Sequence, residues 1–157
     1  MTPAAQPAPS ESVAFKLHRA TVLVDQAADM FLRAQFGISY SLFSVILVAG
    51  TLSSPNQRQI ARALGVTRAS ITQRLAQLIE MGLVQTTPDE QDSRALIVHL
   101  TESGGALLAK AWQAMEADDD GIDRGVETAL LARELDTLIA NATARIEHLR
   151  AQETSES

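Results

Sequence analysis

The sequence predicts a mainly α-helical fold with one small β-hairpin, and two observations carry this expectation. Apolar residues recur at helical spacing along most of the chain. Two short β-prone runs, Leu83–Thr87 and Leu96–Leu100, flank a polar loop. The 157 residues suffice for one compact domain, which we place over 12–150. It lies between a disordered, proline-rich arm over 1–11 and a flexible polar tail over 151–157.

Local signals place the helices at either end of this domain. The first helix, over about Ser12–Gln35, carries an apolar heptad seam and stops before Gly37. The second, over about Tyr40–Ala49, is apolar on all sides, so we expect it at the buried centre. Beyond the hairpin, Thr101 is placed to cap a fifth helix, and a last helix with its own apolar seam follows a break over 118–125.

The middle of the chain predicts two short helices joined by a tight turn. Ser54, followed by Pro-Asn-Gln, is typical of a capped helix start. Gly65 allows the sharp turn, and Thr67 is placed to cap the next helix. Such a pair is the helix-turn-helix that places a helix in the DNA major groove. The stripe that the second helix would bury comprises Ile71, Leu75, Leu78 and Ile79.

The opposite face of this second helix carries small or amide side chains, which allow close approach to base edges and, for glutamine, pairing with adenine. Arg68 and Arg74 flank the face, within reach of phosphates or guanine. Arg58 and Arg62 on the preceding helix are better placed for phosphates. Together with Thr67, the residues of the face are Ala69, Ser70, Gln73, Ala76 and Gln77.

Charge is unevenly distributed along the chain. The formal net charge is −6, which by itself argues against a nucleic-acid partner. Between residues 55 and 86, however, four arginines and one glutamate give +3, whereas residues 101–157 hold five basic and twelve acidic residues, giving −7. An acidic protein can present one arginine-rich segment to phosphates, so the distribution permits DNA binding.

A helix-turn-helix pattern alone also occurs in folds that do not bind DNA, where its outer face is simply solvated. The hairpin that follows directly favours DNA binding, because it completes the pattern as a wing. The chain resembles the MarR family of bacterial winged helix-turn-helix regulators in two stretches, IARALGVTRASITQRLAQLIEMGLV and PDEQDSRALIVHLTESG. The resemblance is dense over 56–105, and the flanking helices extend it over nearly the whole chain.

The resemblance implies a homodimer, with 12–36 and 101–150 as dimerisation helices and 37–100 as the DNA-binding part. It further implies that Arg94 inserts into the minor groove and that Asp92 orients it by a salt bridge. A two-fold dimer would bind a pseudo-palindromic operator in double-stranded DNA. The wing departs from the family pattern, because three acidic residues face Arg94 and many members carry basic residues at the positions of Thr86 and Ser93. A winged-helix adapter that binds protein instead of DNA is therefore the alternative.

Members of the family commonly bind small aromatic or anionic molecules, and the resemblance implies a repressor that such an effector releases. Arg33 is placed to hold a carboxylate and the aromatic residues to hold a ring. Ordinary core and interface packing is the alternative for each of these residues. The candidates are Met30, Phe31, Arg33, Tyr40, Phe43, Trp112 and Met115.

Several other classes find no support in the sequence. The chain has no cysteine, its three histidines are scattered and its aspartates over 118–123 lack the alternation of a calcium loop, so we expect no metal site or cofactor. No nucleophile motif or phosphate-binding glycine loop is present, so we expect no catalytic residues and no enzyme. The first twelve residues do not resemble a secretory signal, and the apolar stretch over 41–52 is too short for a bilayer, so we expect a cytoplasmic protein without a membrane partner.

Overall fold

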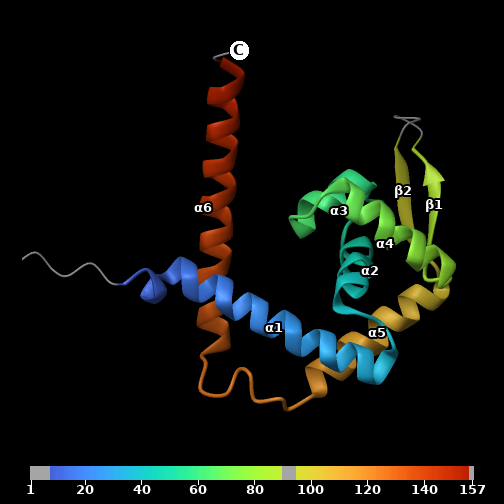
Figure 1. The fold of residues 1–157 in the computed structure, drawn as a ribbon, viewed down its shortest axis with the longest axis horizontal. Helices are drawn as coiled ribbons and strands as arrows, with labels where there is room; N and C mark the ends of the chain where they lie inside the picture. Colours follow the sequence, from blue (N-terminus) through green and yellow to red (C-terminus); the bar gives the residue numbers. More distant parts are fainter. Residues whose placement is uncertain (1–7, 90–94, 156–157) are drawn as a thin grey trace, which may run out of the picture. The chain divides into compact units, whose positions relative to one another are not determined.

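The computed structural model describes residues 8–89 and 95–155, and it confirms a mainly helical fold with a two-stranded antiparallel hairpin (Figure 1). The chain forms two compact units, 1–118 and 119–157, which we consider separately. The elements of the first unit are η1 (Pro9–Glu11), α1 (Val13–Phe36), α2 (Tyr40–Thr51), α3 (Gln57–Leu64), α4 (Arg68–Glu80), β1 (Val84–Pro88), β2 (Leu96–Leu100) and α5 (Glu102–Ala117). The second unit contains α6 (Thr128–Ser155).

The helix ends follow the sequence signals in most places. Gly37 adopts a left-handed conformation at φ 66° and ends α1. The hydroxyl of Thr67 accepts a hydrogen bond from the N–H of Ser70, and that of Thr101 accepts one from the N–H of Gly104. These bonds satisfy backbone donors that have no partner within the helix, so α4 and α5 begin at the predicted positions.

The predicted start of α3 at Ser54 is wrong, because Asn56 is the residue that caps this helix. The side chain of Asn56 accepts from the N–H of Gln59 at 3.0 Å, and the side chain of Gln59 accepts from the N–H of Asn56 at 2.8 Å. The carbonyl of Pro55 accepts from the N–H of Val98 at 2.9 Å, and Asn56 pairs with Ile97 of β2. Residues 55 and 56 are therefore extended alongside the hairpin, and the helix begins only after them.

The core of the first unit surrounds α2, as its apolar sequence predicts. This helix contacts α1, α3, α4, α5 and β2. The buried stripe of α4 consists of Ile71, Leu75 and Leu78, but Ile79 is 46% exposed, which corrects the predicted stripe. At 100° per residue Ile79 lies about 80° from Ile71, at the edge of the stripe. The core residues of α2 are Phe43, Val45, Ile46 and Ala49.

The hairpin follows α4 directly. Its strands pair from Val84 with Leu100 to Pro88 with Leu96, so β1 begins one residue later than predicted. Val84 and Val98 are buried and anchor the hairpin against the helices. The predicted wing residues Asp92 and Arg94 lie outside the described residues.

The second unit is built on one long helix. None of the described side chains of α6 is buried, and most of its large apolar residues are exposed. The helix runs to Ser155, past residue 150, where the sequence predicts a flexible tail. The large exposed apolar residues of α6 are Leu130, Leu131, Leu138, Ile139, Ile146 and Leu149.

Among the described residues, no single helix combines the length and apolar character needed to cross a membrane. The helices α1 and α2 meet this test only as a pair, and they are bent by 90° relative to each other. Nor do the described parts of the chain bring together three or more histidine or carboxylate side chains that could hold a metal ion.

Candidate nucleic-acid interface

Helices α3 and α4 form a compact helix-turn-helix. Gly65 at φ 65° turns the chain after α3, and the N–H of Val66 donates to the carbonyl of Ala61 at 3.0 Å. Ala61 is buried, and its small side chain allows the two helices to pack closely. Across the pair, the hydroxyl of Thr72 donates to the side-chain oxygen of Gln57 at 3.2 Å. This packing makes α3 and α4 one rigid unit.

The outer face of α4 is open to solvent, as its sequence predicts. The side chains of Gln73 and Gln77 are exposed, and their amides make no hydrogen bond with the described parts of the chain. Ala69 and Ala76 are exposed beside them, and Ser70 is half-buried. The face is therefore uncharged and free to contact a partner.

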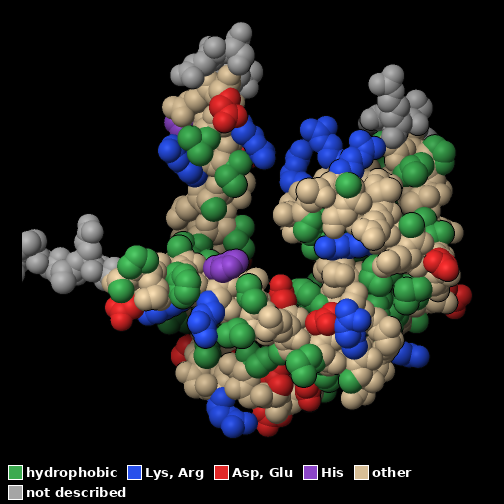
Figure 2. Space-filling view, viewed as in Figure 1, with side chains coloured by type: hydrophobic (Ala, Val, Ile, Leu, Met, Phe, Trp, Pro, Cys, Tyr) green, Lys and Arg blue, Asp and Glu red, His purple; other side chains and the backbone are tan. Residues whose placement is uncertain are grey.

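Arginines surround this face. Arg58, Arg62 and Arg68 are exposed, whereas Arg74 is half-buried. None of the four forms an ion pair with a described carboxylate. Figure 2 shows basic side chains gathered over α3 and the adjoining part of α4. Exposed arginines without an ion pair to a described carboxylate are suited to a polyanionic partner, even on a protein of net charge −6.

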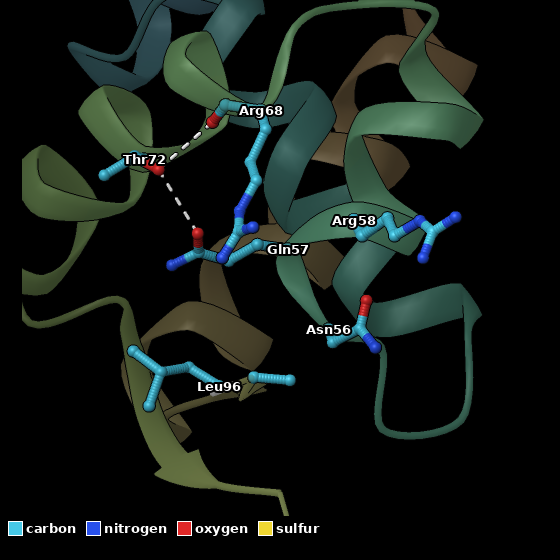
Figure 3. A pocket seen from close by; sticks show the side chains of 7 residues that line it. Asn56, Gln57, Arg58, Arg68, Thr72 and Leu96 are labelled. Atoms are coloured by element: carbon cyan, nitrogen blue, oxygen red, sulfur yellow. Dashed lines mark hydrogen bonds between the residues drawn. The ribbon is translucent and has the colours of Figure 1, made fainter. Parts of the chain in front are cut away.

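A hollow of about 490 Å³ opens where α3, α4 and β2 meet (Figure 3). Arg68 and Thr72 of α4 lie opposite Gln57 of α3, and Leu96 of β2 lies on the side of the wing. The hydroxyl of Thr72 is held by Gln57 and also donates to the carbonyl of Arg68 at 3.1 Å. The sequence gives no signal for Gln57 and Thr72, because their contact joins positions fifteen residues apart.

Comparison with known proteins supplies the deciding observation. The model of the MarR family matches residues 34–95, which include the helix-turn-helix and the start of the wing. A solved structure of the transcriptional repressor CouR bound to a 23-mer DNA duplex is 28% identical, covers 85% of this chain and 94% of CouR, and has a TM-score of 0.69. The segment 34–95 is a winged helix-turn-helix of the MarR type.

Curated relatives of this chain are described as regulators. PecS of Dickeya dadantii, an HTH-type transcriptional regulator, is 28% identical over 59% of this chain and 57% of PecS. The transcriptional repressor NicR of Pseudomonas putida is 36% identical over 48% of this chain and 51% of NicR. The chain thus spans little more than half the length of these two relatives. A second CouR structure, from Rhodococcus jostii RHA1 with p-coumaroyl-CoA bound, is 26% identical over 87% of this chain and 96% of CouR, with a TM-score of 0.74.

The structure separates the seven residues considered as effector contacts, and Phe31 packs against the core with its ring centroid 6.4 Å from that of Phe36. Phe43 is fully buried in the core, Trp112 is 47% exposed on α5, and Met115 packs against the core. Met30 and Tyr40 line one hollow, of about 400 Å³ between α1 and α2, and the carboxylates of Asp25 and Asp29 line it with them. The remaining candidate, Arg33, is bonded to one of these carboxylates, Asp29.

A second hollow, of about 340 Å³, adjoins the first because both are lined by Asp25, Tyr40 and Ser41. Leu64 and Arg74 of the helix-turn-helix line it as well. Sequence reasoning places Arg74 beside the DNA-facing surface, and the structure shows that its side chain also borders this hollow. The hollow therefore connects α1 and α2 to α4.

Asp29 ties α1 to the start of α2. One carboxylate oxygen accepts from Nε of Arg33 at 2.6 Å, and the other accepts from the N–H of Tyr40 at 2.8 Å. The bond from Arg33, followed by that from Tyr40, lowers the pKa of Asp29. Burial and the neighbouring carboxylate of Asp25 raise the pKa of Tyr40.

We expect Asp29→Asn to lower the melting temperature at about pH 7, and we expect the difference from the parent chain to shrink as the pH falls. A carboxyl whose folded-state pKa is depressed stabilises the fold above its unfolded pKa of about 3.9. This stabilisation is lost as the pH falls through the folded-state pKa. Thermal melts across this range measure the effect, with Glu116→Gln as the control because Glu116 bonds to none of the described residues. A difference that persists unchanged in acid would contradict the role of Asp29.

Proposed function

We propose that this chain is a sequence-specific, dimeric DNA-binding regulator of transcription that acts as a repressor in the cytoplasm. The observation that carries the proposal is the uncharged outer face of α4, which is exposed and bordered by arginines without ion pairs to described residues. A recognition helix needs such a face for base edges and such flanks for phosphates. CouR, which was solved on a DNA duplex, supports this assignment.

The relatives named above are described as regulators or repressors, which supports a role without catalysis. The acidic net charge favours the alternative, a winged-helix adapter that binds a protein. Most of the acidic excess, however, lies in residues 101–157, outside the helix-turn-helix. Local charge therefore favours DNA, because exposed charges farther from a phosphate than one Debye length, about 8 Å at physiological salt, are largely screened.

Exposed apolar side chains support a homodimer. Both α1 and α5 expose large apolar residues at the surface of the first unit, and α6 exposes a seam along its length. Single exposed apolar residues are common, but continuous rows of them are typical of association surfaces. We propose that the helices within 12–36 and 101–150 form this interface. The exposed apolar residues of α1 and α5 are Val13, Phe15, Leu17, Val22, Leu23, Val24, Met30 and Trp112.

We further propose that a small aromatic or anionic effector releases the DNA, for which the CouR complex with p-coumaroyl-CoA is a precedent. An anionic group would contact Arg74 instead of Arg33, because Arg33 already bonds to Asp29. The ring would lie against Leu64 and Val66 in the hollow of about 340 Å³. Occupation of this hollow would displace α4, which bears Arg74, relative to α1.

We expect Arg68→Ala to weaken binding to every duplex, because Arg68 lies where it can reach phosphates. Arg58→Ala should weaken binding to all duplexes alike and reduce the slope of log affinity against log salt by about 1. Both arginines are exposed, so their loss leaves the fold intact. Fluorescence anisotropy with a duplex from the chain's own promoter, at several salt concentrations, measures these effects.

Arg124→Ala is the matched control for this experiment. It removes the same charge from the loop before α6, where Arg124 forms an exposed ion pair with Asp119 at 3.8 Å. We expect two chains to bind each duplex. We also expect an active aromatic acid to raise the melting temperature of the protein and to release it from DNA. Affinity that is independent of salt, or equal losses in all three variants, would favour the adapter.

A further inference from the structure

We propose that α4 selects A·T base pairs in each half-site, with Gln73 and Gln77 pairing to adenine and Ala69 and Ala76 packing against thymine methyl groups. This inference rests on the proposed function and specifies the DNA sequence class that the same surface would bind. It is carried by the chemistry of the exposed face and by the positions of the arginines at its edges.

The first step is the position of each side chain around α4. Taking Ile71 at the centre of the buried stripe and 100° per residue, Ala69 lies at about 160° and Gln73 at about 200°. Arg68 and Arg74 each lie only about 60° from Ile71, so both are closer to the buried side than to the outer face. Arginine and lysine are the side chains that most often pair with guanine, and the outer face has neither.

The second step is the freedom of the two amides. Gln73 and Gln77 are exposed and make no hydrogen bond with the described part of the chain. A glutamine amide presents a donor and an acceptor together, which matches N7 and the N6 amino group of adenine in the major groove. The two residues lie four apart, about 6 Å along the helix, so they address different base pairs on the same face.

The third step concerns the residues beside the amides. Ala69 and Ala76 present only methyl groups, and thymine is the base with a methyl group in the major groove. The hydroxyl of half-buried Ser70 pairs with either kind of base and adds no preference. The face thus offers partners for both members of an A·T pair and a specific partner for neither member of a G·C pair.

The final step concerns the hollows that Arg68 and Arg74 line on either side of α4. Arg68 lines the hollow between α3 and β2 with Gln57 and Thr72 (Figure 3). Arg74 is half-buried and lines the hollow that contains Tyr40. From these positions their charges act on the phosphates at either edge of the groove, and they contribute affinity without favouring guanine.

Selection of duplexes from a random library with the full chain tests the inference, followed by anisotropy on one selected duplex. We expect a two-fold related A·T core in which replacement of a central A·T pair by G·C weakens binding about tenfold. Substitution of that adenine by 7-deazaadenine, which lacks N7, should give a similar loss. Uracil in place of its neighbouring thymine, which removes only the methyl group, should give a smaller one.

If Gln73 pairs with one adenine of each half-site, Gln73→Ala should bind the duplex with 7-deazaadenine at that position as tightly as the unmodified duplex. Gln77→Ala should show the same equality at a different adenine of the half-site. Gln152→Ala, which changes an exposed glutamine of α6 beyond the proposed dimerisation helices, is the matched control and should keep the full discrimination. Salt-dependent binding with no preference for A·T, or with a G·C core, would overturn this inference and leave the proposed function standing. Absence of salt-dependent binding to any duplex would instead overturn the proposed function itself.

Discussion

Replacing Gly104 with alanine is expected to destabilise the protein by about 3 kcal/mol or more, because there is no room for the added methyl group. A Cβ at this position would overlap the carbonyl oxygen of Leu83 and lie 3.0 Å from its carbonyl carbon. Leu83 cannot easily move away. Its N–H donates to the carbonyl of Leu78 at 2.9 Å, and its own carbonyl accepts from the N–H of Thr101 at 3.1 Å. The contact fixes the start of α5 against the base of the hairpin.

Gly105→Ala is the matched control, because it adds the same methyl group one position along the same helix. A Cβ on Gly105 has no atom within 4 Å, and alanine is the better helix former. We expect this variant to be more stable than the parent chain by about 0.5–1 kcal/mol. Urea denaturation at one fixed chain concentration measures both variants, since the stability of a dimer depends on concentration. Similar stabilities for the two variants would show that Leu83 and α5 are not packed as described.

The elements were predictable wherever a local signal determines them. Thr67 and Thr101 cap helices because a threonine hydroxyl reaches a backbone N–H three residues ahead, and this needs no information from elsewhere in the chain. The start of α3 was not predictable, because the extended conformation of Pro55 depends on its bond to Val98, more than forty residues away. Gly104 ends the stretch PDEQDSRALIVHLTESG that resembles the MarR family, but the reason for a glycine there, the carbonyl of Leu83, appears only in the structure.

The candidate site likewise has one part that follows from a local signal and one part that depends on tertiary contacts. The outer face of α4 follows from helical periodicity, so Gln73 and Gln77 were found from the sequence alone. The lining of the hollows could not be predicted in this way, because a hollow is lined by separate elements and residue type does not reveal which side chains share it. Asp25, Tyr40 and Arg74 line one hollow. Asp25 and Tyr40 lie on consecutive helices, α1 and α2, whereas Arg74 lies on α4. Likewise, the sequence predicts that Arg33 could bind a ligand carboxylate, but in the structure its guanidinium already bonds to Asp29.

Phe43→Ala is expected to destabilise the protein by about 3–5 kcal/mol. Phe43 is fully buried on α2, the helix that contacts α1, α3, α4, α5 and β2, so its loss would leave a cavity at the centre of the first unit. Neither of the hollows beside Tyr40 is lined by Phe43. Urea denaturation of the two chains at equal concentration measures the loss, and a lower midpoint with an unchanged slope would identify it as a loss of stability alone.

Phe43→Leu is the control, because leucine refills most of the volume and should cost less than about 1.5 kcal/mol. The pair separates the two interpretations of this residue. A core residue loses stability in proportion to the cavity that its replacement leaves, whether or not an effector is present. A residue that served only to hold an effector would lose affinity for it, and Phe43→Ala would then unfold at the same urea concentration as the parent chain. That second result would remove Phe43 from the centre of the core and restore it as an effector contact.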